Sequence, residues 1–178
     1  MTAPERAPAS VWRDGPDHYG RASRLLHWTT VLLIILSFTL AWTWFLPGRG
    51  PLQNEMVDVH RMIGITVLVL SLLRILRRLW GRPQTLRHDP LWIRMAARLT
   101  QFALMALLVL IPLCGWAYTN AGGFEVHIFA ITLPHLVPRD HYLEELTVEL
   151  HETLATVLLV LVGLHSLGAV RHWLKARA

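Results

Sequence analysis

The chain has 178 residues, of which 53% are hydrophobic and 16% are charged, and its formal net charge at pH 7 is +5. This length is enough for one domain, and the apolar fraction is high for a water-soluble domain of that size. The single cysteine, Cys114, excludes an intrachain disulfide, a thiolate zinc site and a cysteine-ligated iron–sulfur cluster.

The first 22 residues are polar and contain several prolines and glycines, which predicts a flexible tail. Four apolar runs follow at about 25–46, 57–76, 99–118 and 150–167, and the last helix is expected to reach about 172. Each run has close to the ~20 residues that an α-helix needs to cross the hydrocarbon core of a membrane. The sequence therefore predicts an all-α fold: an integral membrane four-helix bundle that occupies residues 23–175.

Basic residues are distributed unevenly between the two sides of the predicted bundle. The tail, the connection at 77–98 with its flanks, and the C-terminus hold fourteen of the 17 lysines and arginines, whereas Arg49, Arg61 and Arg139 lie on the other side. The positive-inside rule then places both termini in the cytoplasm. The same bias explains the positive net charge without a nucleic-acid partner. Membrane lipid is the expected partner of these basic residues.

Four of the ten histidines lie at or within the predicted spans, where a metal-binding side chain is costly and is a functional candidate. The alternating direction of the helices puts His27 and His165 near the cytoplasmic side, and His60 and His151 near the outer side. On the fourth helix, His151 and His165 are 14 residues apart, so their imidazoles share one face about 21 Å apart. The third run has no histidine, and we expect it to be structural.

Two imidazole pairs with few carboxylates nearby favour haem iron over a zinc or di-iron centre, because a porphyrin supplies the other four ligands. We therefore predict two haem b groups, one held by His27 and His165 and one by His60 and His151. No CxxCH sequence is present, so covalent attachment of the c type is excluded. Two axial histidines leave the iron no open position, which predicts electron transfer.

Small residues one turn beyond three of the histidines would make room for a flat macrocycle, although they also suit ordinary helix packing: Gly64, Ala155 and Ala169.

The histidine motifs resemble those of the bacterial cytochrome b561 family. They are His27-Trp28, His60-Arg-Met-Ile-Gly64, His151-Glu-Thr-Leu-Ala155 and Gly163-Leu-His165. The resemblance covers about residues 19–175, and the two motifs on the fourth helix are its most specific part. It implies a multi-pass protein of the bacterial inner membrane with two b haems, and all four ligand positions are filled here. It also implies an oxidoreductase reaction in which periplasmic superoxide is oxidised and electrons pass to ubiquinone.

A quinone site needs hydrogen-bond donors beside an apolar slot near one haem. The candidates are His172, two turns beyond His165 on the same helix face, and Ser23; the alternative is that both are interfacial residues solvated by headgroups. The outer segments carry eight acidic residues against three arginines, so their net field does not attract superoxide, although Arg61 and Arg139 would form a local positive spot. The outer segment 124–136 suits an interfacial amphipathic segment or a docking surface for a periplasmic redox protein.

Three functions remain open from the sequence. The first carries electrons from a small periplasmic reductant, with superoxide as the candidate, or from a periplasmic redox protein to membrane quinone. The second is a membrane-anchoring cytochrome b subunit of a larger respiratory complex, such as a hydrogenase or formate dehydrogenase, which would copurify with its partner. The third is a transporter or channel that uses intramembrane histidines, and it predicts a colourless protein.

Overall fold

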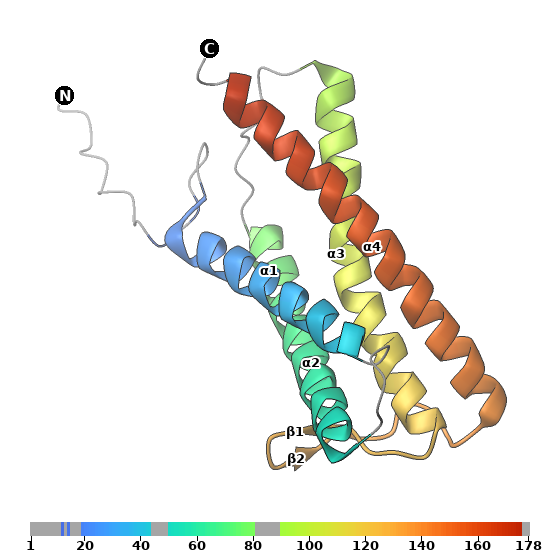
Figure 1. Cartoon of the computed structure of the whole chain (residues 1–178). Coiled ribbons are helices and arrows are strands. Elements are labelled where there is room, and N and C mark those ends of the chain that lie inside the picture. The colour runs from blue at the N-terminus through green and yellow to red at the C-terminus, as the bar shows by residue number, and fades with distance from the viewer. Residues whose placement is uncertain (1–11, 13, 15–18, 44–49, 81–89, 176–178) are drawn as a thin grey trace, which may run out of the picture.

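The computed structural model describes residues 12, 14, 19–43, 50–80 and 90–175. Its elements are α1 (Arg21–Trp42), α2 (Pro51–Trp80), α3 (Leu91–Ala121), the antiparallel hairpin of β1 (His127–Ile128) and β2 (Ile131–Thr132), and α4 (His141–Lys175) (Figure 1). All four helices are long and apolar enough to cross a membrane. The predicted all-α four-helix membrane bundle is therefore confirmed, and the short hairpin is an addition that the sequence analysis did not anticipate.

The helices extend further than the apolar runs that predicted them. The third begins at Leu91 instead of 99 and the fourth at His141 instead of 150. Apolar runs mark the segment inside the hydrocarbon, whereas helical hydrogen bonding continues into the polar interface on either side. The first helix ends at Trp42, and residues 44–46 of its predicted span lie outside the described residues, as does most of the predicted tail at 1–22.

Packing within the bundle is uneven. The most extensive contact joins α3 to α4, while α2 packs against both α3 and α1. The buried core consists of Ile63 and Val67 from α2, Leu107 and Leu108 from α3, and Leu158 from α4. In the described part of the chain, the backbones of α1 and α4 do not approach each other closely. An apolar cavity of about 290 Å³ lies between these two helices, lined by Ile34, Ile35, Phe38, Thr39, Leu159 and Val162.

Four crossings bring the start of α1 and the end of α4 to one end of the bundle, here called the terminal end (Figure 1). The opposite end, which carries β1 and β2 beside the start of α2, is called the hairpin end. There the chain leaves α3 through Gly123, whose φ of 88° lies in the left-handed region that favours glycine. The side chain of Asn120 is fully buried; its Nδ2 donates to the carbonyl of Phe124 (3.1 Å) and its Oδ1 accepts from the amide of Leu136 (2.9 Å). One asparagine thus fixes both halves of the α3–α4 connection.

Replacing Asn120 with alanine is expected to destabilise the hairpin end by roughly 2 kcal/mol, because it removes the partners of two backbone groups. Thermal unfolding in detergent, followed together with limited proteolysis of the α3–α4 connection, measures the effect. Asn54→Ala, at an exposed position of α2, is the matched control. Equal stability and equal proteolysis of the two variants would contradict the role assigned to Asn120.

Candidate functional site

The four intramembrane histidines lie at two depths in the bundle, and each is partly buried. His60 of α2 and His151 of α4 are near the hairpin end, with ring centroids 6.1 Å apart and ring planes at 73°. His27 of α1 and His165 of α4 lie nearer the terminal end. The structure therefore places His60 beside His151, while the pairing of His27 with His165 stays a prediction from their depth along the helices.

The two histidines at the hairpin end are oriented by backbone carbonyls. Nδ1 of His151 donates to the carbonyl of Ile111 on α3 (2.9 Å), and Nδ1 of His60 donates to the carbonyl of Ser37 on α1 (3.1 Å), with the Ser37 hydroxyl also 3.1 Å away. A carbonyl can only accept, so Nδ1 carries the proton in both rings and Nε2 keeps its lone pair. This is the arrangement in which a histidine binds a metal through Nε2 while its other nitrogen is held by a second group.

The separation of these two rings fits one metal ion between them. A metal–imidazole bond is about 2 Å long, so two imidazoles that bind one ion from opposite sides have centroids roughly 6 Å apart. Among the described residues, no group of three or more His, Cys, Asp or Glu side chains is placed to hold an ion. The remaining ligands would then come from a macrocycle. A Cβ built on Gly64 meets nothing within 4 Å, so the space one turn beyond His60 is open.

Helix α3 contributes to this site, although the absence of histidine from its apolar run predicted a purely structural helix. It supplies the Ile111 carbonyl, and it also leaves room for the ring of His151 at Gly115. A Cβ on Gly115 would lie 3.1 Å from both Cε1 and Nδ1 of that ring. Glycine inside a helix costs about 1 kcal/mol relative to alanine, which is the one sequence signal that could have drawn attention to this position.

The pair at the terminal end has different surroundings. Nδ1 of His27 lies 3.4 Å from Nη2 of Arg74 on α2. A guanidinium can only donate, so this nitrogen of His27 accepts, and the ring proton is on Nε2. Ser71, one turn before Arg74, is 3% exposed, and its hydroxyl has no hydrogen-bond partner among the described residues. Polar groups at this end therefore keep unused hydrogen-bonding capacity.

Of the two quinone-site candidates, the structure describes the side-chain contacts of Ser23 but not those of His172. The hydroxyl of Ser23 donates to Oδ2 of Asp14 (2.8 Å), and Oδ1 of Asp14 accepts from the amide of Gly20 (2.7 Å). Asp14, which the sequence analysis did not single out, thus holds the start of α1, where a carboxylate is favoured by the helix dipole. His172 lies on α4 two turns beyond His165, and its side chain is outside the described residues.

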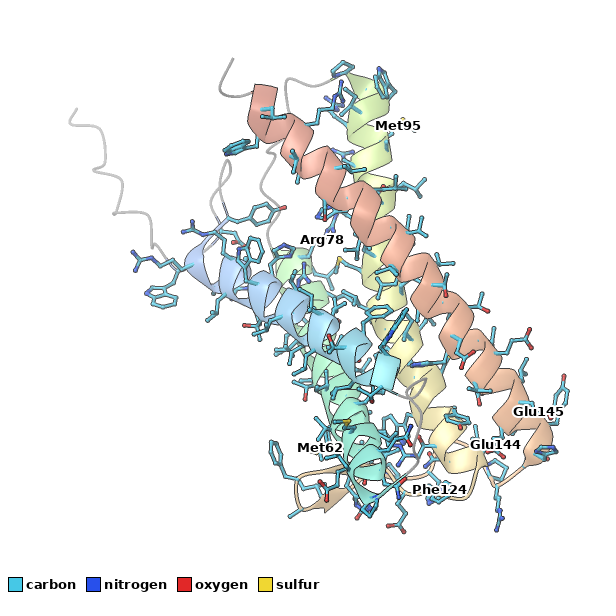
Figure 2. The ribbon with its side chains drawn as sticks, in the orientation of Figure 1. Met62, Arg78, Met95, Phe124, Glu144 and Glu145 are labelled. Carbon is cyan, nitrogen blue, oxygen red and sulfur yellow. The ribbon has the colours of Figure 1, made fainter. Side chains whose placement is uncertain are left out.

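At the hairpin end, Arg61 and Arg139 converge on the segment Gly123–Phe124. Arg61, which follows His60, forms an ion pair with Asp58 (2.8 Å), and its guanidinium carbon lies 5.9 Å from the centroid of the Phe124 ring. Arg139 packs over Gly123, where an added Cβ would be 3.0 Å from Cδ of the arginine. Figure 2 shows Phe124 at this end of the bundle, far from Met95 near the start of α3.

A bundle of four membrane-crossing helices, with imidazoles spaced and polarised to hold a metal between them, has the architecture of a membrane cytochrome. The chain belongs to the prokaryotic cytochrome b561 family, whose sequence profile matches residues 18–178. It is accordingly a multi-pass protein of the bacterial inner membrane that binds haem b and takes part in membrane electron transfer. The family is the one that the histidine motifs resemble.

Two relatives match over most of their length. The chain is 28% identical to the probable superoxide oxidase CybB of Yersinia pestis over 151 residues, which cover 83% of this chain and 84% of the relative. It is 26% identical to the cytochrome b561 homolog 2 of Escherichia coli strain K12 over 161 residues, which cover 88% of this chain and 85% of the relative.

Replacing Gly115 with alanine is expected to push the imidazole of His151 away from the Ile111 carbonyl and to loosen haem binding by about 10- to 100-fold. The measurement is the transfer of haem from the purified protein to apomyoglobin. Thr156→Ala, at an exposed position of α4 where the hydroxyl bonds to the Glu152 carbonyl of the same helix, is the control. Both changes raise helix propensity, so a loss confined to Gly115→Ala reports the contact with His151. Equal haem transfer from both variants would contradict this role.

Proposed function

We propose that this chain is a di-haem cytochrome b that oxidises superoxide on the periplasmic side and reduces ubiquinone in the membrane. The balanced reaction converts two superoxide ions, one quinone and two protons into two dioxygen molecules and one quinol. The observation that carries the proposal is the pair His60 and His151, whose ring centroids are 6.1 Å apart and whose Nδ1 atoms are both held by carbonyls. The hairpin end then faces the periplasm, and both termini lie in the cytoplasm.

The residues proposed to hold the haems are His60 with His151, and His27 with His165, within a haem-binding domain at 23–175. Haem b bound between two imidazoles supplies a one-electron iron couple with no open position for dioxygen. The 14-residue interval between His151 and His165 places the two sites on one face of α4, about 21 Å apart along the helix. Each pair also draws its second histidine from another helix, so both sites lie inside the bundle.

The two sites make different demands on their surroundings. His60 and His151 already carry their protons on Nδ1, so Nε2 is free to bind without any change. His27 can bind through Nε2 only after its proton moves to Nδ1, and that nitrogen then repels a donor. Arg74 must therefore release His27 when the cytoplasmic site forms, which frees its guanidinium for another acceptor.

Attraction of superoxide is assigned to Arg139 and, with its charge partly offset by the ion pair with Asp58, to Arg61. Both lie against Gly123–Phe124 at the hairpin end, and Arg61 follows the proposed ligand His60 in sequence. A local positive spot raises the encounter rate of a small anion even where the wider surface is acidic. The similarity to a relative named as a probable superoxide oxidase supports this donor.

Quinone reduction is assigned to the cytoplasmic side, near Ser23 and His172. The hydroxyl proton of Ser23 is held by Asp14, so Ser23 can donate to a quinone oxygen only when Asp14 releases that proton. A protonated Asp14 would release it, because its own O–H can then donate to Ser23 Oγ. The pair would thereby deliver one of the two protons that quinone reduction requires.

Two alternatives are weaker than this proposal. A transporter or channel does not agree with membership of an electron-transfer family. An anchoring subunit of a larger respiratory complex remains the second candidate from the sequence, but the named superoxide oxidase matches this chain over 84% of its own length, which favours a reaction carried out by the chain alone. Full activity of the isolated chain would separate the two.

Single alanine replacements of the four histidines are expected to remove the haems by pairs. The purified protein should carry two b haems by pyridine haemochrome quantitation. His60→Ala and His151→Ala should lose the same haem in potentiometric titration, and His27→Ala and His165→Ala should lose the other. His135→Ala, at an exposed position of the connection, is the control and should keep both. A colourless protein, or one haem that persists in all four variants, would overturn the proposed ligation.

The double variant Arg61→Gln/Arg139→Gln is expected to lower kcat/KM for superoxide by about tenfold at low salt and to flatten its dependence on ionic strength. Stopped-flow decay of superoxide in the presence of a soluble ubiquinone measures both effects. Ser23→Ala provides the contrast: it should raise KM for the quinone and leave the salt dependence for superoxide as in the parent protein. If the quinone-coupled rate were the same in the parent protein and the double variant, and did not change with salt concentration, electrostatic capture at this end would be excluded.

A further inference from the structure

A second pocket lies at the terminal end, against the first turns of α1. It has a volume of about 420 Å³ and is lined by Trp12, Arg21, Arg24, Leu25 and Trp28. The four residues of α1 recur at helical spacing and so occupy one face of the helix. Trp12 comes from the segment before the helix and completes the lining of the pocket. None of these residues belongs to the proposed haem or quinone sites.

The charges in this pocket are not balanced by the protein. Among the described residues, neither Arg21 nor Arg24 has a carboxylate oxygen within 4.0 Å, whereas Arg61 at the other end is paired with Asp58. The nearest described acid along the chain, Asp14, is committed to Gly20 and Ser23. Two guanidinium groups therefore face one pocket with their hydrogen-bonding capacity available for an anion, and arginine suits the planar, bidentate recognition of phosphate.

Below the arginines, the same face of α1 continues as an apolar stripe. Leu25, Trp28, Leu32 and Ile35 follow one another at helical spacing, and more than half of each side chain is exposed. In a membrane protein this face lies against lipid tails, and tryptophan favours the boundary between tails and headgroups. The surface thus offers two cations, an indole pair at the boundary, and an apolar stripe that extends over about three helical turns.

We propose that this face of α1 binds one anionic phospholipid. Its phosphate lies on Arg21 and Arg24, its glycerol backbone lies between Trp12 and Trp28, and one acyl chain follows Leu32 and Ile35. Two basic residues beside a lipid surface attract an anionic headgroup, and each contributes about fivefold to the affinity. A free phosphate would use the arginines but not the stripe. This inference does not depend on the proposed reaction, since it concerns the lipid-facing side of α1 and no residue of the proposed haem or quinone sites.

The test is native mass spectrometry of the haem-loaded full-length protein in neutral detergent, titrated with phosphatidylglycerol or with phosphatidylcholine of the same acyl chains. Phosphatidylglycerol should bind with one high-affinity event that phosphatidylcholine lacks. Arg21→Gln/Arg24→Gln should weaken that event by about 30-fold. Arg98→Gln/Arg171→Gln removes the same charge from exposed positions at the same end and should leave it intact. Arg21→Lys/Arg24→Lys, which keeps both charges but loses the planar forks, should weaken that event less than the glutamine pair does.

Several outcomes would overturn the proposal. Equal binding of the two lipids by the parent protein would do so without any variant, and so would equal weakening in both glutamine pairs. Displacement of phosphatidylglycerol by glycerol phosphate at the same concentration would show that the site takes an anion alone. The protein could also dimerise when lipid is removed. If the stripe variant Leu32→Ser abolished that dimer, this face would be assigned to a second copy of the chain.

Discussion

Polar groups placed in hydrocarbon must find partners within the protein, and at the hairpin end this constraint ties the whole bundle together. His60 of α2 bonds to a carbonyl of α1, His151 of α4 bonds to a carbonyl of α3, and the two rings lie edge to face with centroids 6.1 Å apart. Two hydrogen bonds and one ring contact thereby connect all four helices in a single chain of interactions. Since α1 and α4 do not approach closely along their backbones in the described residues, this chain is an important link between them.

The two ends of the bundle differ in the chemical groups that contact the histidines and their surroundings. At the hairpin end, backbone carbonyls hold the two histidines and the buried Asn120 holds the α3–α4 connection, and none of these partners can change its charge. At the terminal end, the corresponding contacts come from Arg74 and Asp14, which are charged side chains. Carbonyls fix one geometry, whereas charged side chains can exchange partners or protons. This contrast agrees with the proposed division between rapid electron entry at one end and proton-coupled quinone reduction at the other.

The features that the sequence predicted are those that depend on local periodicity. Apolar run length predicted four spans, and the rise of a helix predicted which histidines share a depth. The ends of the helices were misjudged because hydrogen bonding continues beyond the apolar run. The acceptor at Ile111 could not be predicted, since every residue has a carbonyl and only packing selects one. Gly115 shows the same limit, because the ring that needs its space lies on another helix, 36 residues away along the chain.

Helix α4 carries one histidine of each proposed pair and leaves the ribosome after α1, α2 and α3. On the proposed ligation, neither site can be completed before α4 has been synthesised, because the three preceding helices offer only His27 and His60. A chain that stops early would therefore lack both tightly held haems. Translation through α4 becomes the condition for redox activity, and copies that stop before it would not pass stray electrons to dioxygen.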